Sequence, residues 1–202
     1  MAKNLSKSKI IVILGKRTSG KTTVAEMLHR LLSNTNLITM QAYAIQAFID
    51  THEITLDEFQ NSHLYTENRQ FLGVFIEHQR KKKKDVFLTP ILDYINKTDQ
   101  VIIEDVFFYN EVSALHSLDA TFIWVDTDEK YRSNRYYTQY LVGKPEYKNK
   151  QQSNFAPYLD NGPLEIEISK LNPSLIKYWS NIHTVTNNHD MDTLRNNLRL
   201  LI

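Results

Sequence analysis

The chain has 202 residues, 42% of them hydrophobic, which suffices to bury one core and is short for two. Lysine and arginine number 24 against 23 aspartate and glutamate, so the net charge of +1 gives no electrostatic basis for binding a nucleic acid or a membrane surface. The absence of cysteine excludes a disulfide scaffold, a thiolate nucleophile and a cysteine-ligated zinc site. We therefore expect one cytoplasmic domain, with no nucleic-acid partner and no membrane attachment.

The first part of the sequence reads as a strand followed by helices. Residues 10–14 form a continuous apolar run, which is typical of a parallel strand covered on both faces. From Val24 onward, apolar residues recur at the spacing of one helical face, so a helix should follow the strand closely. A short second strand is expected at residues 37–40, and a helix at residues 42–51.

A longer helix is expected at residues 66–82, with a strongly basic end. Before it, Thr55 and Glu58 have the spacing of a capping box, in which each side chain bonds the backbone of the other residue. The apolar residues that the helix should turn toward the core are Phe71, Leu72, Phe75 and Ile76.

The second part repeats the strand pattern at residues 101–105 and 121–126, with a last short strand at 182–185. An amphipathic helix over residues 191–201 closes the chain. Residues 141–162 are polar and lack a periodic pattern, as in a lid. Strands alternating with helices predict an α/β fold, a parallel sheet with helices on both faces.

A phosphate-binding loop connects the first strand to the first helix. Residues 15–22 match the pattern G-x-x-x-x-G-K-[ST] at every position. Gly15 and Gly20 allow a tight turn whose N–H groups face phosphate oxygens, Lys21 reaches the β- and γ-phosphates, and the Thr22 hydroxyl is the expected Mg²⁺ ligand. The predicted ATP-binding residues of this segment are Gly15, Lys16, Arg17, Thr18, Ser19, Gly20, Lys21, Thr22 and Thr23.

A GTPase was the first alternative, since residues 96–99 spell the guanine-reading pattern N-K-x-D. That motif should follow a buried strand, whereas residues 91–95 have a helical pattern with Pro90 in the first turn. We interpret residues 96–99 as a turn that ends a helix.

Three further features favour a kinase. Asp105 ends a buried strand, where it could order Mg²⁺, directly or through a water, or approach the acceptor; a simple strand cap is the alternative. Arg132 and Arg135 lie on one helical face, from which they could clamp phosphoryl groups, unless they only pair with nearby carboxylates. The third feature is a cationic helix that precedes these elements in the chain. Its candidate acceptor-binding residues are Arg69, Arg80 and Lys81.

Several of these segments resemble the P-loop nucleoside monophosphate kinases, nearest the deoxynucleoside monophosphate kinase and animal-type phosphomevalonate kinase branch. Residues 13–22 look like the phosphate loop of that branch, and residues 104–111 are similar to its D-V-R-F-x-N-E segment. Arg132 and Arg135 sit where the lid arginines of such kinases begin. Residues 186–187 resemble the terminal T-N of the branch.

The resemblance implies one P-loop kinase domain over residues 1–202, with a five-stranded parallel sheet of order 2-3-1-4-5. ATP would lie at the loop, with its adenine near Asn187. The acceptor would bind across the cleft in a helical region at about 41–98, under a lid at about 128–165. Phe107 departs from the family pattern, because it stands where the family carries a phosphate-binding arginine.

The expected reaction is transfer of the γ-phosphoryl group of ATP, with Mg²⁺ as cofactor, to a (deoxy)nucleoside monophosphate. A phosphomevalonate acceptor is the alternative within the same class. A nucleotide-binding module without transferase activity is the alternative outside it, because of Phe107. The expected partners are a nucleotide and a small phosphorylated acceptor, and the chain is expected to be a monomer or a homodimer.

Overall fold

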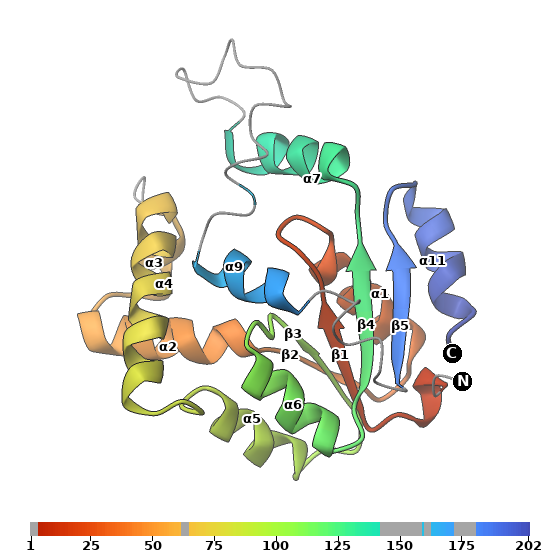
Figure 1. Ribbon diagram of the computed structural model, residues 1–202, viewed down its shortest axis with the longest axis horizontal. Helices are drawn as coiled ribbons and strands as arrows, with labels where there is room; N and C mark the ends of the chain where they lie inside the picture. The colour runs from red at the N-terminus through yellow and green to blue at the C-terminus, as the bar shows by residue number, and fades with distance from the viewer. Residues whose placement is uncertain (1–3, 62–64, 142–158, 160–162, 172–180) are drawn as a thin grey trace.

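A computed structural model describes residues 4–61, 65–141, 159, 163–171 and 181–202. At its centre lies one five-stranded parallel sheet, ordered β2-β3-β1-β4-β5 (Figure 1). This is the fold class and strand order expected from the sequence. The strands are β1 (Ile10–Leu14), β2 (Asn36–Thr39), β3 (Val101–Glu104), β4 (Thr121–Asp126) and β5 (Ile182–Thr186).

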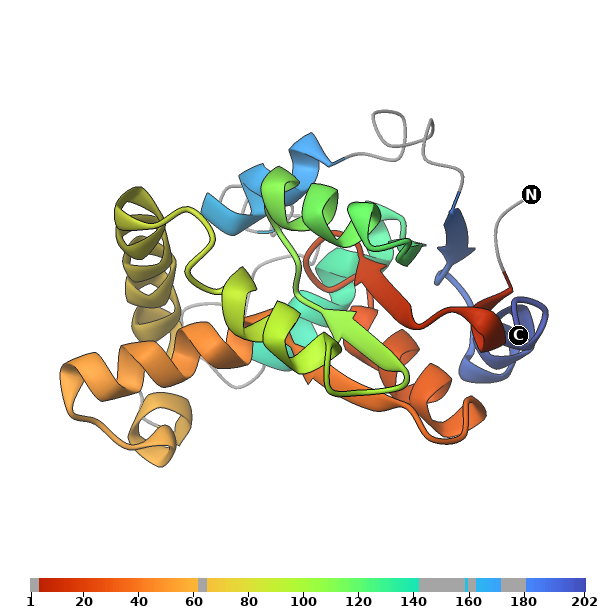
Figure 2. The ribbon, with the colours of Figure 1, turned by 90° about the horizontal axis from the view of Figure 1, so that it is seen from below.

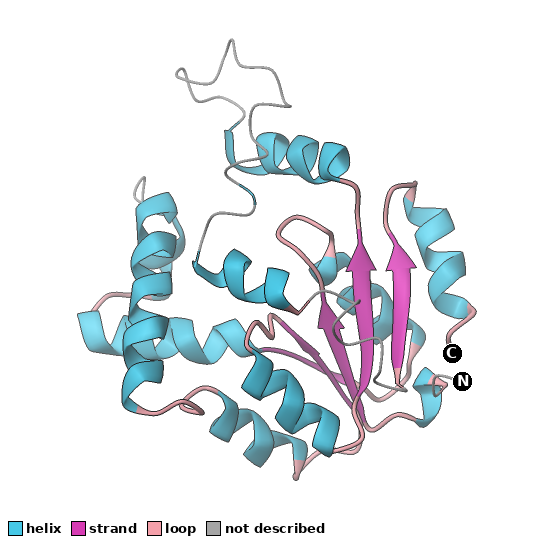
Figure 3. Cartoon of the chain, viewed as in Figure 1, coloured by secondary structure: helices cyan, strands magenta, loops and turns pink. Residues whose placement is uncertain are grey.

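Helices alternate with the strands along the chain (Figure 3). A short 3-10 turn η1 (Leu5–Lys7) precedes the sheet, and a π-helical turn η2 (Tyr137–Leu141) follows α7. The α-helices with printed bounds are α1 (Lys21–Leu31), α2 (Met40–His52), α3 (Leu56–Asn61), α4 (Tyr65–Lys82), α5 (Leu88–Ile95), α6 (Tyr109–Ser117), α7 (Glu129–Tyr136), α9 (Pro163–Lys170) and α11 (Met191–Arg199).

The sheet separates two apolar cores, because successive side chains of a strand point to opposite faces. Ile13 and Ile102 pack with α1 and α11 on one face. Val12 and Ile103 pack with α2, α5 and α6 on the other. Figure 2 shows helices on both sides of the strands. The continuous apolar runs that predicted central strands therefore reflect burial on both faces.

The structure confirms the predicted capping box and corrects one core assignment. Thr55 N–H donates to Glu58 Oε2 at 2.7 Å, and Glu58 N–H donates to Thr55 Oγ1 at 3.1 Å. Phe71, however, is 60% exposed, so its assignment to the core was wrong. Leu72 and Ile76, one helical turn apart, form the buried stripe of α4, and Phe71 lies about 100° around the helix from Leu72.

The order of the elements confirms the turn expected at residues 96–99. Residues 91–95 lie in α5, and β3 begins only at Val101, so residues 96–99 form the expected turn after a helix. Within the described part of the chain, no helix has the length and apolar character required to cross a bilayer. Most of the expected lid, residues 142–158 and 160–162, lies outside the described residues.

Truncating Ile102 should strongly destabilise the fold. Its side chain is fully buried between the sheet and α1, so Ile102→Ala removes apolar contacts and leaves a cavity. We expect a loss of about 2–5 kcal/mol in the free energy of unfolding, measured by chemical denaturation. Leu200→Ala is the matched control, because Leu200 is 85% exposed and should change stability by less than about 0.5 kcal/mol. Equal effects of both substitutions would contradict the assigned core.

Candidate functional site

The phosphate loop lies between the end of β1 and the start of α1, and its two glycines are required by geometry. Gly20 has a φ of 93°, and a Cβ there would lie 2.2 Å from Asn187 Nδ2. A Cβ on Gly15 would lie 2.7 Å from Ser19 Oγ and 2.8 Å from the Val125 carbonyl oxygen. Real Cβ atoms do not approach other atoms so closely, so a side chain at either position would displace the loop.

The backbone of this loop is held by side chains from α7 and from the residues that directly follow β4 and β5. The Ser19 carbonyl accepts hydrogen bonds from Thr127 Oγ1 at 2.9 Å, Arg135 Nη1 at 3.0 Å and Asn187 Nδ2 at 2.8 Å. The Arg135 Nη2 group also donates to the Asn187 carbonyl at 2.8 Å. These bonds fix the orientation of the loop backbone.

Both arginines predicted to clamp phosphates lie on α7 and donate to this same backbone. Arg132 is almost fully buried, and its Nη1 donates to the Arg17 carbonyl at 3.3 Å. In return, Thr18 Oγ1 donates to the Arg132 carbonyl at 2.9 Å. Arg135 also lines the cleft beside the loop. Burial lowers the pKa of Arg135 from its usual value. An anion in the cleft would lie beside this partly desolvated cation.

A cleft of about 660 Å³ opens on the inner side of the loop, within the range of small-molecule sites. The Lys21 ammonium donates to the Lys16 carbonyl at 3.3 Å. Gln41, Asp105 and Phe107 line the same cleft. The predicted ATP-binding residues that line this cleft are Arg17, Thr18, Gly20, Lys21, Thr22 and Thr23.

Asp105 begins the segment that leaves β3. Its φ of 58° is left-handed, which is uncommon for a residue with a side chain and occurs often at functional sites. Its Oδ2 accepts a hydrogen bond of 3.1 Å from Thr39 Oγ1, at the end of β2. Asp105 thus lines the cleft together with residues of the phosphate loop.

Glu104 is a candidate site residue that the sequence analysis did not select. Its side chain is buried beside Thr22, and the Thr22 hydroxyl favours the charged form of the carboxylate. Burial, and secondarily the charge of Asp105, raises the pKa of Glu104, and Lys21 opposes the shift. The alternation of β3 could have revealed this placement. Glu104 lies two residues after Ile102, so it shares the face covered by α1, the helix that carries Thr22.

These groups fit a magnesium ion bound mainly through phosphates. Among the described residues, no three His, Cys, Asp or Glu side chains gather closely enough to hold a metal. Glu104 Oε2 is buried and has no hydrogen-bond partner within the described chain, so it is an unsatisfied oxygen ligand next to the Thr22 hydroxyl. Mg²⁺ prefers oxygen ligands and retains waters, and it is commonly held by one or two protein groups and a substrate phosphate.

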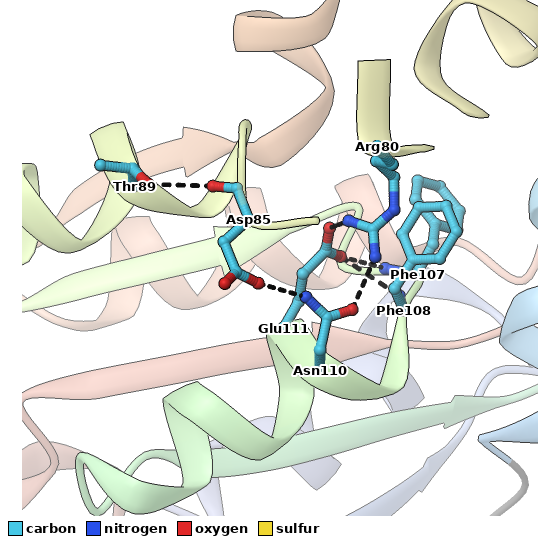
Figure 4. A network of polar contacts seen from close by, with 7 residues as sticks. All are labelled: Arg80, Asp85, Thr89, Phe107, Phe108, Asn110 and Glu111. Carbon is cyan, nitrogen blue, oxygen red and sulfur yellow. Dashed lines mark hydrogen bonds and ion pairs between the residues drawn. The ribbon is translucent and has the colours of Figure 1, made fainter. Parts of the chain in front are cut away.

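The three cations predicted to bind the acceptor lie in different surroundings. Arg80 Nη1 lies 2.6 Å from Glu111 Oε1, and Arg80 Nη2 donates to Asn110 Oδ1 at 2.6 Å (Figure 4). Lys81 is exposed near the end of α4. Arg69 belongs to α4, but its side chain lies outside the described part of the structure. Neither Arg80 nor Lys81 is among the described residues that line the cleft.

A small recess of about 20 Å³ adjoins the cleft and shares Gln41, Asp105 and Phe107 with it. Its walls come from α2, α4, α6 and α9 and the connections between them. The apolar residues lining it are Met40, Ala44, Ile76, Phe87, Phe107, Phe108 and Leu164. The acceptor side of the site is therefore largely apolar.

Comparison with solved structures assigns the fold. The chain is similar to the Thermus thermophilus protein TT1252, at 15% identity over 96% of each chain, with a TM-score of 0.55. It is also similar to a gluconokinase from Sinorhizobium meliloti 1021, at 13% identity over 98% of this chain and 93% of the other, with a TM-score of 0.51. A shikimate kinase from Acinetobacter baumannii in complex with shikimate matches at 11% identity over 98% and 92%, with a TM-score of 0.51.

The chain has the P-loop kinase fold. No protein-family model matches its sequence, and no curated protein matches it. The P-loop kinase fold places the loop after β1 and gathers the ends of the other strands around it, as observed here for Asp105, Thr127 and Asn187.

Replacing Glu104 should specifically weaken the magnesium dependence of nucleotide binding. Glu104→Gln keeps the size of the side chain but removes the charge that would support the ion. We expect the additional rise in unfolding temperature that Mg²⁺ gives over ATP alone to fall to less than half, measured by thermal unfolding with and without the metal. Because burial disfavours the charged form, the ligand-free variant should unfold at the wild-type temperature or above.

Glu77→Gln is the control for this measurement, because Glu77 lies exposed on α4. It should leave the magnesium increment unchanged. An undiminished increment in Glu104→Gln would remove Glu104 from the metal site.

Proposed function

We propose that this chain is a Mg-ATP-dependent phosphotransferase that acts on a small acceptor. One observation carries the proposal: residues of the phosphate loop and Asp105 line the same cleft of about 660 Å³. Such a cleft can hold the phosphates of a nucleotide against one wall and an acceptor against the other. Two proteins of similar fold are named as a gluconokinase and a shikimate kinase, which supports small-molecule phosphorylation.

In this proposal the loop binds the triphosphate through backbone N–H groups at the positive end of α1 and through the Lys21 ammonium. Thr22 and Glu104 hold the magnesium ion, which offsets charge on the phosphate oxygens when bound. Arg135, beside the loop, stabilises charge that develops on the transferred group. Asp105 orients the attacking oxygen of the acceptor and accepts its proton.

The resemblance of residues 104–111 and 186–187 to one kinase branch supports a phosphorylated acceptor, a (deoxy)nucleoside monophosphate first and phosphomevalonate second. In that case Lys81 and Arg69 are the remaining acceptor-binding candidates on α4, because Arg80 is paired with Glu111. ADP release would be measured with each of these acceptors and with unphosphorylated compounds. ATP binding without turnover of any acceptor would instead favour the nucleotide-binding module.

Removing the loop lysine should abolish phosphoryl transfer without unfolding the protein. Lys21 is the side chain that reaches the transferred phosphate in this proposal, so Lys21→Ala should lower kcat by about 10²–10³-fold or more. The measurement is ADP release with the best acceptor, together with circular dichroism to confirm the fold.

Lys97→Ala is the matched control, since it removes the same charge from an exposed turn. This turn precedes β3, whereas the phosphate loop follows β1, so the two lie at opposite ends of the parallel strands. It should keep wild-type turnover. Unreduced turnover in Lys21→Ala would count directly against a kinase mechanism at this loop.

A further inference from the structure

The part of the cleft lined by Gln41, Asp105 and Phe107, here called the acceptor wall, has no cation among these described residues. The recess next to Asp105 is lined by one further charged residue among those described, Glu111. Both are carboxylates. A phosphate group brought to this wall would face the Asp105 carboxylate and no described cation, because the charge of Glu111 is already paired with Arg80.

The nearest candidate cation, Arg80, is already engaged by protein groups (Figure 4). Its guanidinium pairs with Glu111 and donates to Asn110, each at 2.6 Å, and it stacks over the Phe108 ring at 3.5 Å. Asn110 Nδ2 in turn donates to Asp85 Oδ1 at 2.7 Å. The Arg80 side chain is 9% exposed, so turning it toward a ligand would break both hydrogen bonds and leave the Glu111 charge buried and unpaired.

The second oxygen of Glu111 is also engaged, and this fixes the aromatic wall. Glu111 Oε2 accepts hydrogen bonds from the N–H groups of Phe107 and Phe108, at 3.3 and 3.2 Å. Phe107 is thus held at the point shared by the recess and the cleft. Gln41 lies at the same point and offers both a donor and an acceptor of hydrogen bonds.

We propose that the acceptor is a neutral hydroxyl compound with a planar heteroaromatic ring, of the nucleoside class, rather than a phosphomonoester. The ring lies against Phe107 in the cleft of about 660 Å³, because the adjoining recess of about 20 Å³ is too small to hold it. Gln41 bonds its heteroatoms, and Asp105 receives the hydroxyl. The inference rests on the proposed phosphotransferase function, and it replaces the phosphorylated acceptors considered there with an unphosphorylated one.

The bonds, electrons and proton of this reaction are all accounted for by the groups already assigned. The acceptor hydroxyl oxygen forms a bond to the γ-phosphorus of ATP, and the bond from that phosphorus to the β,γ-bridging oxygen breaks. The electron pair of the broken bond leaves with ADP. The hydroxyl proton passes to the Asp105 carboxylate and then to solvent. The product is a phosphomonoester and needs no further reactant.

The first test compares each nucleoside with its own 5′-monophosphate in an ADP-release assay with the full chain, using thymidine, deoxyadenosine, deoxycytidine and deoxyguanosine. We expect at least one nucleoside to have a kcat/KM tenfold or more above that of its monophosphate. Equal or greater turnover of the monophosphates overturns the inference, as does turnover of neither when calorimetry shows that ATP binds. Failure of ATP to bind overturns the proposed function itself, and this inference with it.

The second test restores the arginine that the resembling kinases carry. Phe107→Arg adds a cation to the acceptor wall, so it should lower kcat/KM for the nucleoside and raise it for the monophosphate, shifting the ratio between them by tenfold or more. Phe107→Leu is the matched control, expected to lower nucleoside turnover without any gain for the monophosphate. Both variants should bind ATP within about twofold of wild type. Identical acceptor ratios in Phe107→Arg and Phe107→Leu would overturn the inference.

Discussion

The candidate site depends on how the Ser19 carbonyl is bonded. A peptide unit is planar, with its N–H and C=O groups pointing in opposite directions, so anchoring carbonyls on the outside of a loop directs N–H groups inward. Here Thr127, Arg135 and Asn187 all donate to that one oxygen. Thr127 and Asn187 directly follow β4 and β5, and Arg135 lies on α7, so these elements together fix the loop backbone. The glycine requirement follows from the same contact, because Asn187 occupies the space in which a side chain at Gly20 would lie.

Much of the fold was predictable because its signals are local. The apolar runs of β1, β3 and β4 reflect burial on both faces of a sheet, and each run is short and bounded by turns. The phosphate loop is a contiguous motif between a strand and a helix, so its position needed no tertiary information. The error at Phe71 has a physical origin: α4 has a narrow buried stripe, and an apolar residue next to that stripe is not distinguished from it by spacing alone.

The partners across the fold could not be predicted, because they join residues far apart in the chain. Asn187 meets Ser19 across 168 positions, and Arg80 meets Glu111 across 31. Arg80 was predicted to bind the acceptor because lysines follow it in the sequence. Its partner Glu111 lies on α6. Glu104 is different, since strand alternation alone would have placed it on the face of β3 that α1 covers. Its neighbour Asp105 was selected because it is the last residue of the strand expected from the sequence, and ligands gather at the carboxyl ends of parallel strands.

The buried pair of Arg80 and Glu111 is better explained by positioning than by stability. Burial raises the pKa of Glu111 and lowers that of Arg80, so desolvation works against both charges, although each charge supports the other. An ion pair of this kind often contributes little net stability compared with apolar residues of the same volume. However, Glu111 also binds the backbone N–H groups of Phe107 and Phe108, directly after Asp105, whose left-handed φ costs about 1–3 kcal/mol. The segment is therefore held by Thr39 at its start and by the ion pair at its end. Asp105, whose backbone is strained, and the Phe107 ring are therefore fixed at one place in the cleft. There they would decide which acceptor binds.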